Sequence, residues 1–329
     1  MSELAVAVYA AERGAHLLDE PRSTGFARFC RSFDERAFIA ELAKEGVRWV
    51  ARSDPSFPLR LREIHDPPPG LFVRGAADLS LLDRPSVAVV GARACSSYGT
   101  AVALAFASEL AAAGVVVVSG LARGVDAAAH RGALEAGETV AVLGCGIDRD
   151  YPRVHATLAA AIAQRGLVVS EYPPGVEPAP WRFPARNRIV AGLALATVVV
   201  EAREKSGALI TADLALDEGR EVLTVPGEIT SQLSRGTNAL LRLGATPANC
   251  AEDVLAAIGI DPKPRRPVRL DPRLERIRAA VADTPIAVDT LARRLGLPAG
   301  EVAAALAELE LLGLVAQAEG LYREVMPST

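Results

Sequence analysis

The sequence predicts an α/β fold: a doubly wound, mostly parallel Rossmann-like sheet, with a short helical N-terminal region and a C-terminal winged-helix domain. Between Ser86 and Pro226, short valine-rich runs alternate with longer Ala/Leu-periodic segments. Runs that are apolar throughout are typical of parallel strands buried on both faces, and the periodic segments between them indicate connecting helices. Several of these segments end at a glycine, as helices often do: Gly114, Gly137, Gly166 and Gly219.

The predicted elements of the central part alternate along the chain. Strands are expected at Leu71–Arg74, Ser86–Val90, Val115–Ser119, Thr139–Leu143, Leu167–Ser170, Thr197–Val200 and Val222–Val225. Helices are expected at Tyr98–Ala113, Val125–Ala136, His155–Arg165, Ile189–Leu195 and Ala208–Gly219. Upstream, the stretch Val47–Gly75 contains several prolines and is expected to be turn-rich chain that leads into the first strand.

Four parts are expected along the chain. Residues 1–44 form the short helical region, and residues 45–258 form an extended Rossmann-like domain that binds DNA. Residues 259–270 combine prolines with Lys263, Arg265, Arg266 and Arg269, a composition that predicts a stiff basic linker. Residues 271–329 contain three short helical patterns and then a glycine turn at Gly320, which is the order of a winged helix.

The composition excludes several classes of protein. The cysteines lie far apart with no CxxC pair, so neither a zinc site nor a disulfide is expected, and the pattern fits a reducing cytoplasm. No apolar stretch approaches the ~20 residues of a membrane span, and residues 1–10 carry no basic leader. A formal net charge of −4 gives no global sign of nucleic-acid binding. Any basic surface must therefore be local.

Basic residues follow each of the six predicted strands from Ser86 onward. In order along the chain they are Arg93; Arg123; Arg149 and Arg153; Arg182, Arg186 and Arg188; Arg203 and Lys205; and Arg235. Because the carboxyl ends of parallel strands meet at one edge, these cations should converge there and form an anion site. Acidic residues share the same loops, so each cation could instead be half of a surface ion pair; the recurrence in six loops favours a binding edge.

No enzyme motif is complete. The GxxxxGK[ST] pattern is absent and Gly144-Cys145-Gly146 lacks a third glycine, so neither ATP nor NAD, nor any other cofactor, is expected. His130 falls inside a helix, so no Ser/His/Asp triad can be assembled and no catalytic residue is assigned. Two alternatives stay open. One is a nucleoside-monophosphate glycosidase with Glu171 or Glu201 as the base, and the other is a nucleotide sensor with a winged-helix output.

Motifs across about Val47–Leu255 resemble the DprA (DNA processing protein A) family. The blocks FPxRNRI and KSG-LITA make the resemblance specific. The matching segments are Val87–Arg93 with Ser97-Tyr98-Gly99, Ser119–Asp126, Gly144–Asp148 with Tyr151-Pro152, Phe183–Leu193, Lys205–Ala212 and Ser234–Asn238.

This resemblance implies a non-enzymatic protein that binds single-stranded DNA, forms a homodimer through the Rossmann-like domain, protects incoming DNA and loads RecA onto it during natural transformation. Leu240, Leu241 and Leu243 are the first place to look for the dimer surface. The implied DNA-binding residues are Arg93, Ser119, Gly120, Arg123, Arg153, Phe183, Arg186, Asn187, Arg188, Lys205, Ser206 and Gly207.

Physical chemistry suggests roles for some of these residues. Arg93, Arg153 and Arg186 suit bidentate contacts to phosphate. Phe183, Tyr98 or Tyr172 could offer stacking faces for bases. The sequence departs from the family in lacking a clear helix-hairpin-helix within residues 1–44, which leaves a DNA role for that region unsupported.

The expected recognition helix of the winged helix is acidic. Gly300–Leu312 contains Glu301, Glu308 and Glu310 and neither lysine nor arginine. A helix that reads the major groove is expected to present basic or amide side chains. We therefore expect this domain to bind protein or to regulate rather than to read DNA.

Overall fold

The computed structural model describes residues 2–13, 24–261, 270–282, 284–312, 314–318 and 320–324. Two compact units are present, Met1–Pro262 and Lys263–Thr329, and each is described by itself. The basic stretch of the expected linker, residues 262–269, lies outside the described residues.

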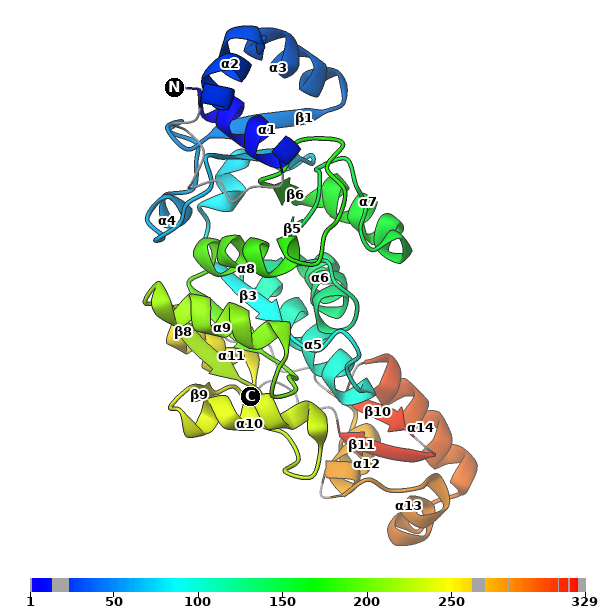
Figure 1. Cartoon of the computed structure of the whole chain (residues 1–329). Helices are drawn as coiled ribbons and strands as arrows, with labels where there is room; N and C mark the ends of the chain where they lie inside the picture. Colours follow the sequence, from blue (N-terminus) through cyan, green and yellow to red (C-terminus); the bar gives the residue numbers. More distant parts are fainter. Residues whose placement is uncertain are drawn as a thin grey trace. The chain divides into compact units, whose positions relative to one another are not determined.

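The first unit is built on a nine-stranded sheet in its described part, with the order β1-β2-β6-β5-β4-β3-β7-β8-β9 (Figure 1). The strands from β6 to β9 in this order are parallel, and β1 and β2 are added antiparallel at one edge. The fold class predicted from the sequence is confirmed. The strands are β1 Val47–Ala51, β2 Gly70–Arg74, β3 Ser86–Val90, β4 Val116–Ser119, β5 Thr139–Val142, β6 Leu167–Ser170, β7 Ala196–Val199, β8 Glu221–Thr224 and β9 Thr246–Pro247.

The direction of winding reverses at β3. From β3 the chain moves outward through β4, β5 and β6, and it then crosses back to place β7 on the other side of β3. Such a reversal opens a crevice beyond the carboxyl ends of the two strands that flank it, where open α/β sheets bind their ligands.

Strand β1 was not expected, because the sequence around it is rich in proline. Its register pairs Val47 with Arg74 and Ala51 with Gly70. The prolines lie in the connection between β1 and β2, where no ladder hydrogen bond is needed, so they do not interrupt either strand.

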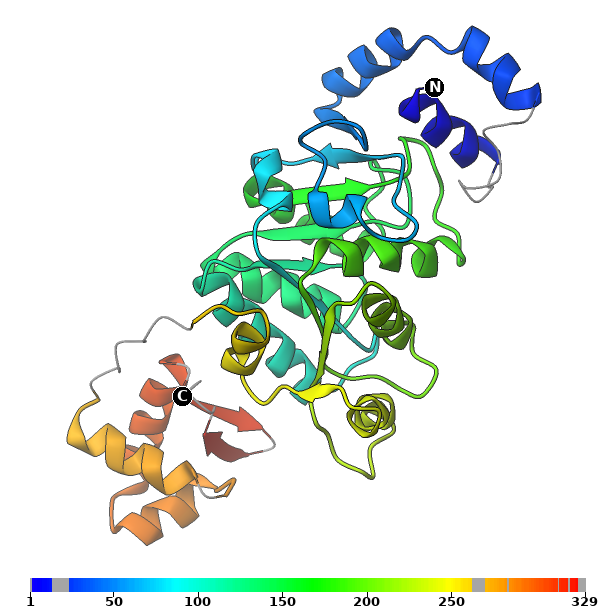
Figure 2. The same cartoon turned by 90° about the vertical axis from the view of Figure 1, so that its left-hand side faces the viewer.

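Helices cover both faces of this sheet (Figures 1 and 2). Helices α5, α6 and α11 contribute to the apolar cluster on one face, and α4, α8 and α9 contribute to the cluster on the other. The helices of this unit are α1 Glu3–Arg13, α2 Thr24–Ser32, α3 Glu35–Lys44, α4 Leu59–Arg62, α5 Ser97–Ala112, α6 Val125–Ala136, α7 Ala156–Arg165, α8 Arg182–Leu193, α9 Gly207–Asp217, α10 Arg235–Arg242 and α11 Ala251–Ala257, with short 3₁₀ turns η1 Leu79–Leu82, η2 Arg153–His155 and η3 Gln232–Ser234.

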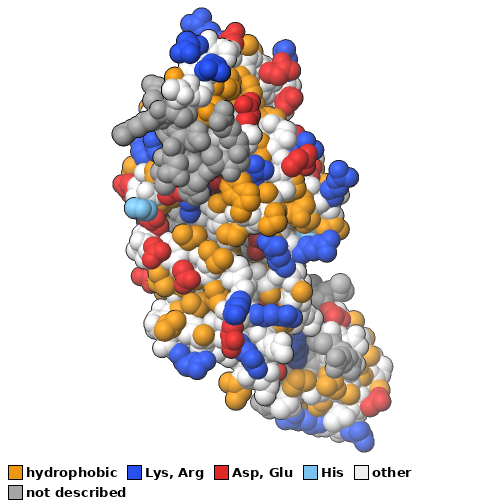
Figure 3. Space-filling model, viewed as in Figure 1, with side chains coloured by type: hydrophobic (Ala, Val, Ile, Leu, Met, Phe, Trp, Pro, Cys, Tyr) orange, Lys and Arg blue, Asp and Glu red, His pale blue; other side chains and the backbone are white. Residues whose placement is uncertain are grey.

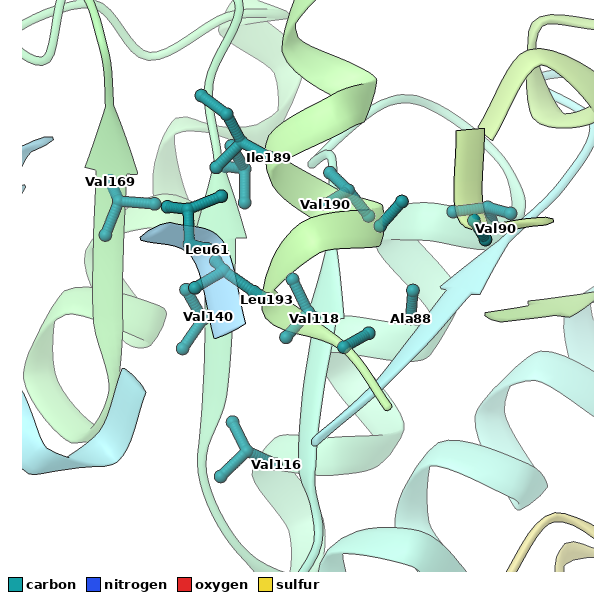
Figure 4. Close-up of a cluster of buried hydrophobic side chains, with 14 of the residues drawn as sticks. Leu61, Ala88, Val90, Val116, Val118, Val140, Val169, Ile189, Val190 and Leu193 are labelled. Atoms are coloured by element: carbon teal, nitrogen blue, oxygen red, sulfur yellow. The ribbon is translucent and has the colours of Figure 1, made fainter. Parts of the chain in front are cut away.

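Helix α8 begins at Arg182, two turns before the start expected from the sequence. Pro184 sits in its first turn, where backbone N–H groups have no partner within the helix, so the proline is tolerated there. Figure 4 shows Ile189, Val190 and Leu193 of this helix among the valines of the central strands. This packing fixes α8 across the sheet and sets the position of its first two turns.

The second unit is a winged helix. Its core gathers apolar residues of three helices, including Ile277, Leu291 and Leu306, and Ile286 pairs with Tyr322 beside the hairpin. The elements are α12 Pro272–Ala282, α13 Val288–Leu295, α14 Ala299–Leu311, β10 Val315–Ala318 and β11 Leu321–Glu324. Among the helices of the described ranges, none is long and apolar enough to cross a membrane.

Candidate nucleic-acid interface

A cavity of about 450 Å³ lies beyond the carboxyl ends of β3 and β4, beside the start of α9. The loops after β3, β4 and β7 line it together with the first turns of α8 and α9. The structure therefore gathers residues from five separate stretches of the sequence, the fifth being Leu233 of η3. The predicted site residues that line it are Arg93, Gly120, Phe183, Arg186, Asn187, Lys205, Ser206 and Gly207.

The mouth of this pocket carries cations that are free to meet an anion. Arg93, Arg203 and Lys205 are exposed and line the pocket. Within the described residues, no ion pair joins any of them to a carboxylate. Exposed, unpaired cations at a cavity favour a ligand with several negative charges.

The start of α9 adds a second kind of anion donor. Ser206 caps this helix, and its hydroxyl accepts a hydrogen bond from the backbone N–H of Ala208 at 3.3 Å. Gly207 has open space where a side chain would stand, so a ligand can approach its backbone closely. The N-terminal N–H groups of a helix favour phosphate oxygens. Asn187 holds the turn, because its side-chain amide donates to the Gly207 carbonyl at 3.2 Å.

Arg186 forms the floor of the pocket, with 4 % of its surface exposed. Its Nη1 donates to the carbonyls of Gly120, at 2.8 Å, and Val142. The guanidinium lies so close to Gly120 that a Cβ there would collide with it. These bonds give Arg186 a positioning role, since they tie together the carboxyl ends of β4 and β5. The phosphate contact expected from the sequence stays a prediction, and Arg186 lines the pocket.

The buried carboxylate of Asp126 also lines this floor. It accepts from the backbone N–H groups of Gly120 at 3.2 Å and Ala122 at 3.3 Å. Burial raises the pKa of Asp126, while Arg186 nearby opposes that shift. Burial likewise lowers the pKa of Arg186. The exposed cations at the mouth are therefore the groups that are available to an anion.

Phe183 supplies an aromatic surface beside the cations. The Arg93 guanidinium lies over its ring at 5.4 Å, and the ring of Tyr151 stacks on it at 5.3 Å with an interplanar angle of 25°. Tyr151 was not predicted as a stacking residue, although the Tyr-Pro pair before Arg153 marked its position. Of the other candidates, Tyr98 is exposed but does not line the pocket.

Tyr172 is not available for a base. Only 6 % of its surface is exposed, and the Arg182 guanidinium lies over its ring at 5.1 Å. The prediction that it could stack is wrong, because its aromatic ring is used inside the fold.

Two of the predicted site residues are engaged elsewhere in the fold. Ser119 is buried, and its hydroxyl donates to the Val89 carbonyl at 2.7 Å, which links β4 to β3. Arg188 forms a bidentate pair with Glu171, at 3.0 and 2.7 Å, and a further bond to Asp66 at 2.9 Å. Neither side chain lines the pocket. Arg123 and Arg153 also lie outside its lining, but both are exposed.

The two carboxylates that could serve as the base of a glycosidase, Glu171 and Glu201, already accept hydrogen bonds from other parts of the fold. Glu171 holds Arg188, and Glu201 accepts from the backbone N–H of Ser96 at 2.8 Å and from its hydroxyl at 2.5 Å. Both bonding patterns hold structural elements in place, which disfavours either group as a general base. In the part of the chain that the structure describes, no three His, Cys, Asp or Glu side chains are grouped to hold a metal ion.

Two family profiles match this chain, one in each of its two units. The sequence profile of the DNA recombination-mediator protein A family matches residues 48–259, and the DprA winged-helix profile matches residues 261–320. The DNA processing protein DprA of Streptococcus pneumoniae is 44 % identical over 240 residues, which cover 69 % of this chain and 83 % of that protein. Protein Smf of Escherichia coli is 40 % identical over 279 residues, covering 81 % of this chain and 74 % of that protein.

Solved structures agree with this assignment. The crystal structure of DNA processing protein A from S. pneumoniae matches with a TM-score of 0.66 at 39 % identity, and covers 78 % of this chain and 92 % of that chain. The Helicobacter pylori protein, solved to describe its single-stranded DNA binding mode, matches with a TM-score of 0.57 at 34 % identity, covering 61 % of this chain and 92 % of that chain. From the fold, the motifs and these matches, the chain belongs to the DNA recombination-mediator protein A family, the DprA family.

Proposed function

We propose that this protein binds single-stranded DNA in the pocket beyond β3 and acts as a recombination mediator that has no catalytic step of its own. The observation that carries the proposal is the meeting of Arg93, Arg203 and Lys205 with the ring of Phe183 at one cavity. A protein that binds single-stranded DNA without sequence preference needs two things: cations that bind the DNA backbone, and an aromatic face on which the bases stack. The binding mode described for the H. pylori relative supports the same conclusion.

A salt titration with oligo-dT tests this function. Affinity that rests on phosphate contacts should fall linearly with salt on a log–log plot, with a slope of about −0.7 per phosphate. Arg93→Ala and Lys205→Ala should each weaken binding and flatten the slope by about 0.7. The matched control is Arg36→Ala, an exposed arginine on α3 that lies outside this pocket. A slope that is the same in wild type and Arg93→Ala would remove Arg93 from the site.

AMP in the same assay separates the rival functions. A nucleotide sensor or a nucleoside-monophosphate glycosidase should bind AMP more tightly than a short oligo-dT, and a glycosidase should also release free adenine. A DNA-binding protein should prefer the oligonucleotide, and its affinity should rise with oligonucleotide length.

The resemblance to DprA proteins implies that this protein forms a homodimer, and we include the homodimer in the proposal. An apolar surface of the first unit supports it. Leu243 is 85 % exposed at the end of α10, and Ile210 is 40 % exposed on α9. Both line a hollow of about 390 Å³ between these helices. Leu240, named with Leu243 from the sequence, is buried and packs inside the unit. The mass of the free protein and of its complex with a long oligonucleotide measures the subunit number, and Leu243→Glu should lower it.

The same proposal includes protection of incoming DNA and delivery of that DNA to RecA. It divides the chain as expected from the sequence, with DNA bound by residues 45–258, a linker at 259–270 and the winged helix at 271–329 outside the DNA site. Nuclease digestion of a bound oligonucleotide tests protection. RecA filament formation on the same oligonucleotide, with and without this protein, tests delivery.

A further inference from the structure

The loop between β4 and α6 holds a carboxylate of its own chain. The loop runs from Gly120 to Gly124, and it lines the pocket. Asp126, in the first turn of α6, accepts with Oδ2 from the backbone N–H of Gly120 at 3.2 Å and of Ala122 at 3.3 Å. Glycine-containing loops at this place in an α/β sheet are typical binding sites for phosphate. Here a side-chain carboxylate occupies the two donors.

The backbone of this loop has the shape of an anion site. Leu121 has a φ of 55°, a left-handed conformation that leucine rarely adopts, and its side chain is fully buried. A left-handed residue within a turn directs successive N–H groups toward one point and makes a concave site for an anion. The N–H groups on either side of Leu121, those of Gly120 and Ala122, both point at Asp126.

A third donor beside the loop is without a partner. Arg186 holds the Gly120 carbonyl with Nη1 at 2.8 Å, so Gly120 is bonded on both sides. Among the described residues, Nη2 of Arg186 has no hydrogen-bond partner, although Arg186 is only 4 % exposed and lines the pocket. Nη2 is also the atom nearest to where a Cβ of Gly120 would stand. A phosphate in place of the Asp126 carboxylate would therefore find two N–H groups and a guanidinium nitrogen.

The cations at the mouth of the pocket are open by contrast. Arg93, Arg203 and Lys205 are exposed, and Figure 3 shows basic side chains gathered between α5 and α9 on this face of the first unit. The phosphodiesters of a strand carry one charge each and bind one after another to cations on a surface. A free nucleotide carries its charge on a terminal phosphate, which is held best where several donors meet at one point.

We propose that Asp126 is a specificity-determining residue, whose carboxylate keeps the phosphate of a free nucleotide out of the β4–α6 loop and so leaves the pocket to strands bound at its mouth. Free nucleotides would otherwise compete with DNA, because both carry phosphate. The benefit to DNA rests on the proposed function, whereas the closed loop rests on the contacts of Asp126.

Titrations of AMP against the full chain test the inference. Asp126→Ala empties the loop, so it should tighten AMP binding about tenfold, since a charged oxygen gains two N–H donors. Binding of an oligo-dT of about 20 nucleotides should change less than about threefold. The matched control is Asp126→Asn, which removes the same charge at the same position but keeps an amide oxygen in the loop. AMP binding by this variant should stay near that of the wild type.

Equal gains for Asp126→Ala and Asp126→Asn would reduce the effect to charge and overturn the inference, as would a folded Asp126→Ala with no gain. Amide resonances of the wild-type chain give a test that does not depend on the folding of a variant. On titration with AMP or with oligo-dT, the amide of Gly207 should shift and those of Gly120 and Ala122 should not. Shifts of equal size at all three would show that the loop is open to phosphate.

The two proposals fail separately. A wild-type chain that binds no oligo-dT would refute the proposed function, and the AMP titrations would still decide whether Asp126 closes the loop. A chain that binds oligo-dT, with no gain of AMP binding in a folded Asp126→Ala, would refute only the role of Asp126.

Discussion

At the scale of single residues, the basic side chains at the carboxyl edge of the sheet divide by what each one already binds. Arg93 and Lys205 have no ion-pair partner among the described carboxylates, and both line the pocket. Arg186 is buried and Arg188 nearly so. Arg186 donates hydrogen bonds to backbone carbonyls, and Arg188 donates to carboxylates. A guanidinium that satisfies buried acceptors stabilises the fold, whereas one that faces solvent unpaired can exchange water for phosphate.

Arg188→Ala is expected to destabilise the protein rather than to remove a DNA contact. The Glu171 side chain is 2 % exposed, so the substitution leaves a buried carboxylate without its cation. Breaking such a pair costs roughly 3–5 kcal/mol. Urea denaturation measures the loss. The double variant Arg188→Met with Glu171→Leu should recover part of the stability, and a single variant as stable as wild type would contradict this account.

Stability should fall in mild acid because of His130. Burial lowers the pKa of its imidazole to about 3 from 6.5, and its Nδ1 bonds Thr139 Oγ1 at 2.8 Å. In the unfolded chain, the imidazole of His130 is therefore protonated near pH 6.5, whereas in the folded protein it is protonated only at about pH 3. Between these values the unfolded state binds more protons, so the free energy of unfolding decreases as the pH falls.

Comparing unfolding free energies at two pH values measures this effect. Between pH 7 and pH 4.5 the contribution of His130 should be roughly 2–3 kcal/mol. In the His130→Gln variant, the free energy of unfolding should no longer show this part of the pH dependence, even if the substitution also lowers the stability at pH 7. His65→Gln, at an exposed histidine, is the matched control and should keep the wild-type slope. Identical slopes for all three proteins would show that His130 does not carry the effect.

At the scale of elements, α8 decides where the site forms. It is the crossover between β6 and β7, and its apolar residues pack on the central strands while its first turns place Phe183, Arg186 and Asn187 at the pocket. The sequence predicted the second half of this helix, whose apolar periodicity is clear. It could not predict the first half, because the FPxRN stretch has no apolar period and contains a proline.

Ile189→Ala should measure how firmly α8 is held. Ile189 is fully buried in the cluster on this face of the sheet. Removing its outer carbons leaves a cavity that costs about 2–4 kcal/mol. The control is Leu216→Ala, since Leu216 is half-exposed on α9, and it should cost well under 1 kcal/mol. Equal losses in a denaturation experiment would mean that α8 does not depend on this packing.

At the scale of the whole molecule, the chain forms two compact units, and the second contains the acidic helix α14. The charges of α14 are partly used within the winged helix, because Glu308 pairs with Arg273 at 3.3 Å and Glu310 accepts from the Gln317 backbone N–H at 3.4 Å. Glu301 remains without an ion pair among the described residues. A helix with these carboxylates and no cation repels phosphate, so it suits a protein partner better than DNA.

Deleting residues 271–329 should therefore leave oligo-dT affinity within about twofold of the full chain. The two units are separately compact, which makes the shortened protein a fair test. Anisotropy titrations of both proteins under the same salt conditions compare the affinities. A loss of tenfold or more would mean that the winged helix contributes to DNA binding.

The sequence by itself determined strands β2 to β8, the helices between them and the winged helix, because strands buried on both faces and amphipathic helices leave local patterns of hydrophobicity. It also determined that cations follow the six parallel strands β3 to β8. Which of those cations are free was decided only by the tertiary structure. Glu171 lies 17 residues from Arg188, and Gly120 lies 66 residues from Arg186. No local pattern records such partners, since they are brought together only when α8 crosses the sheet.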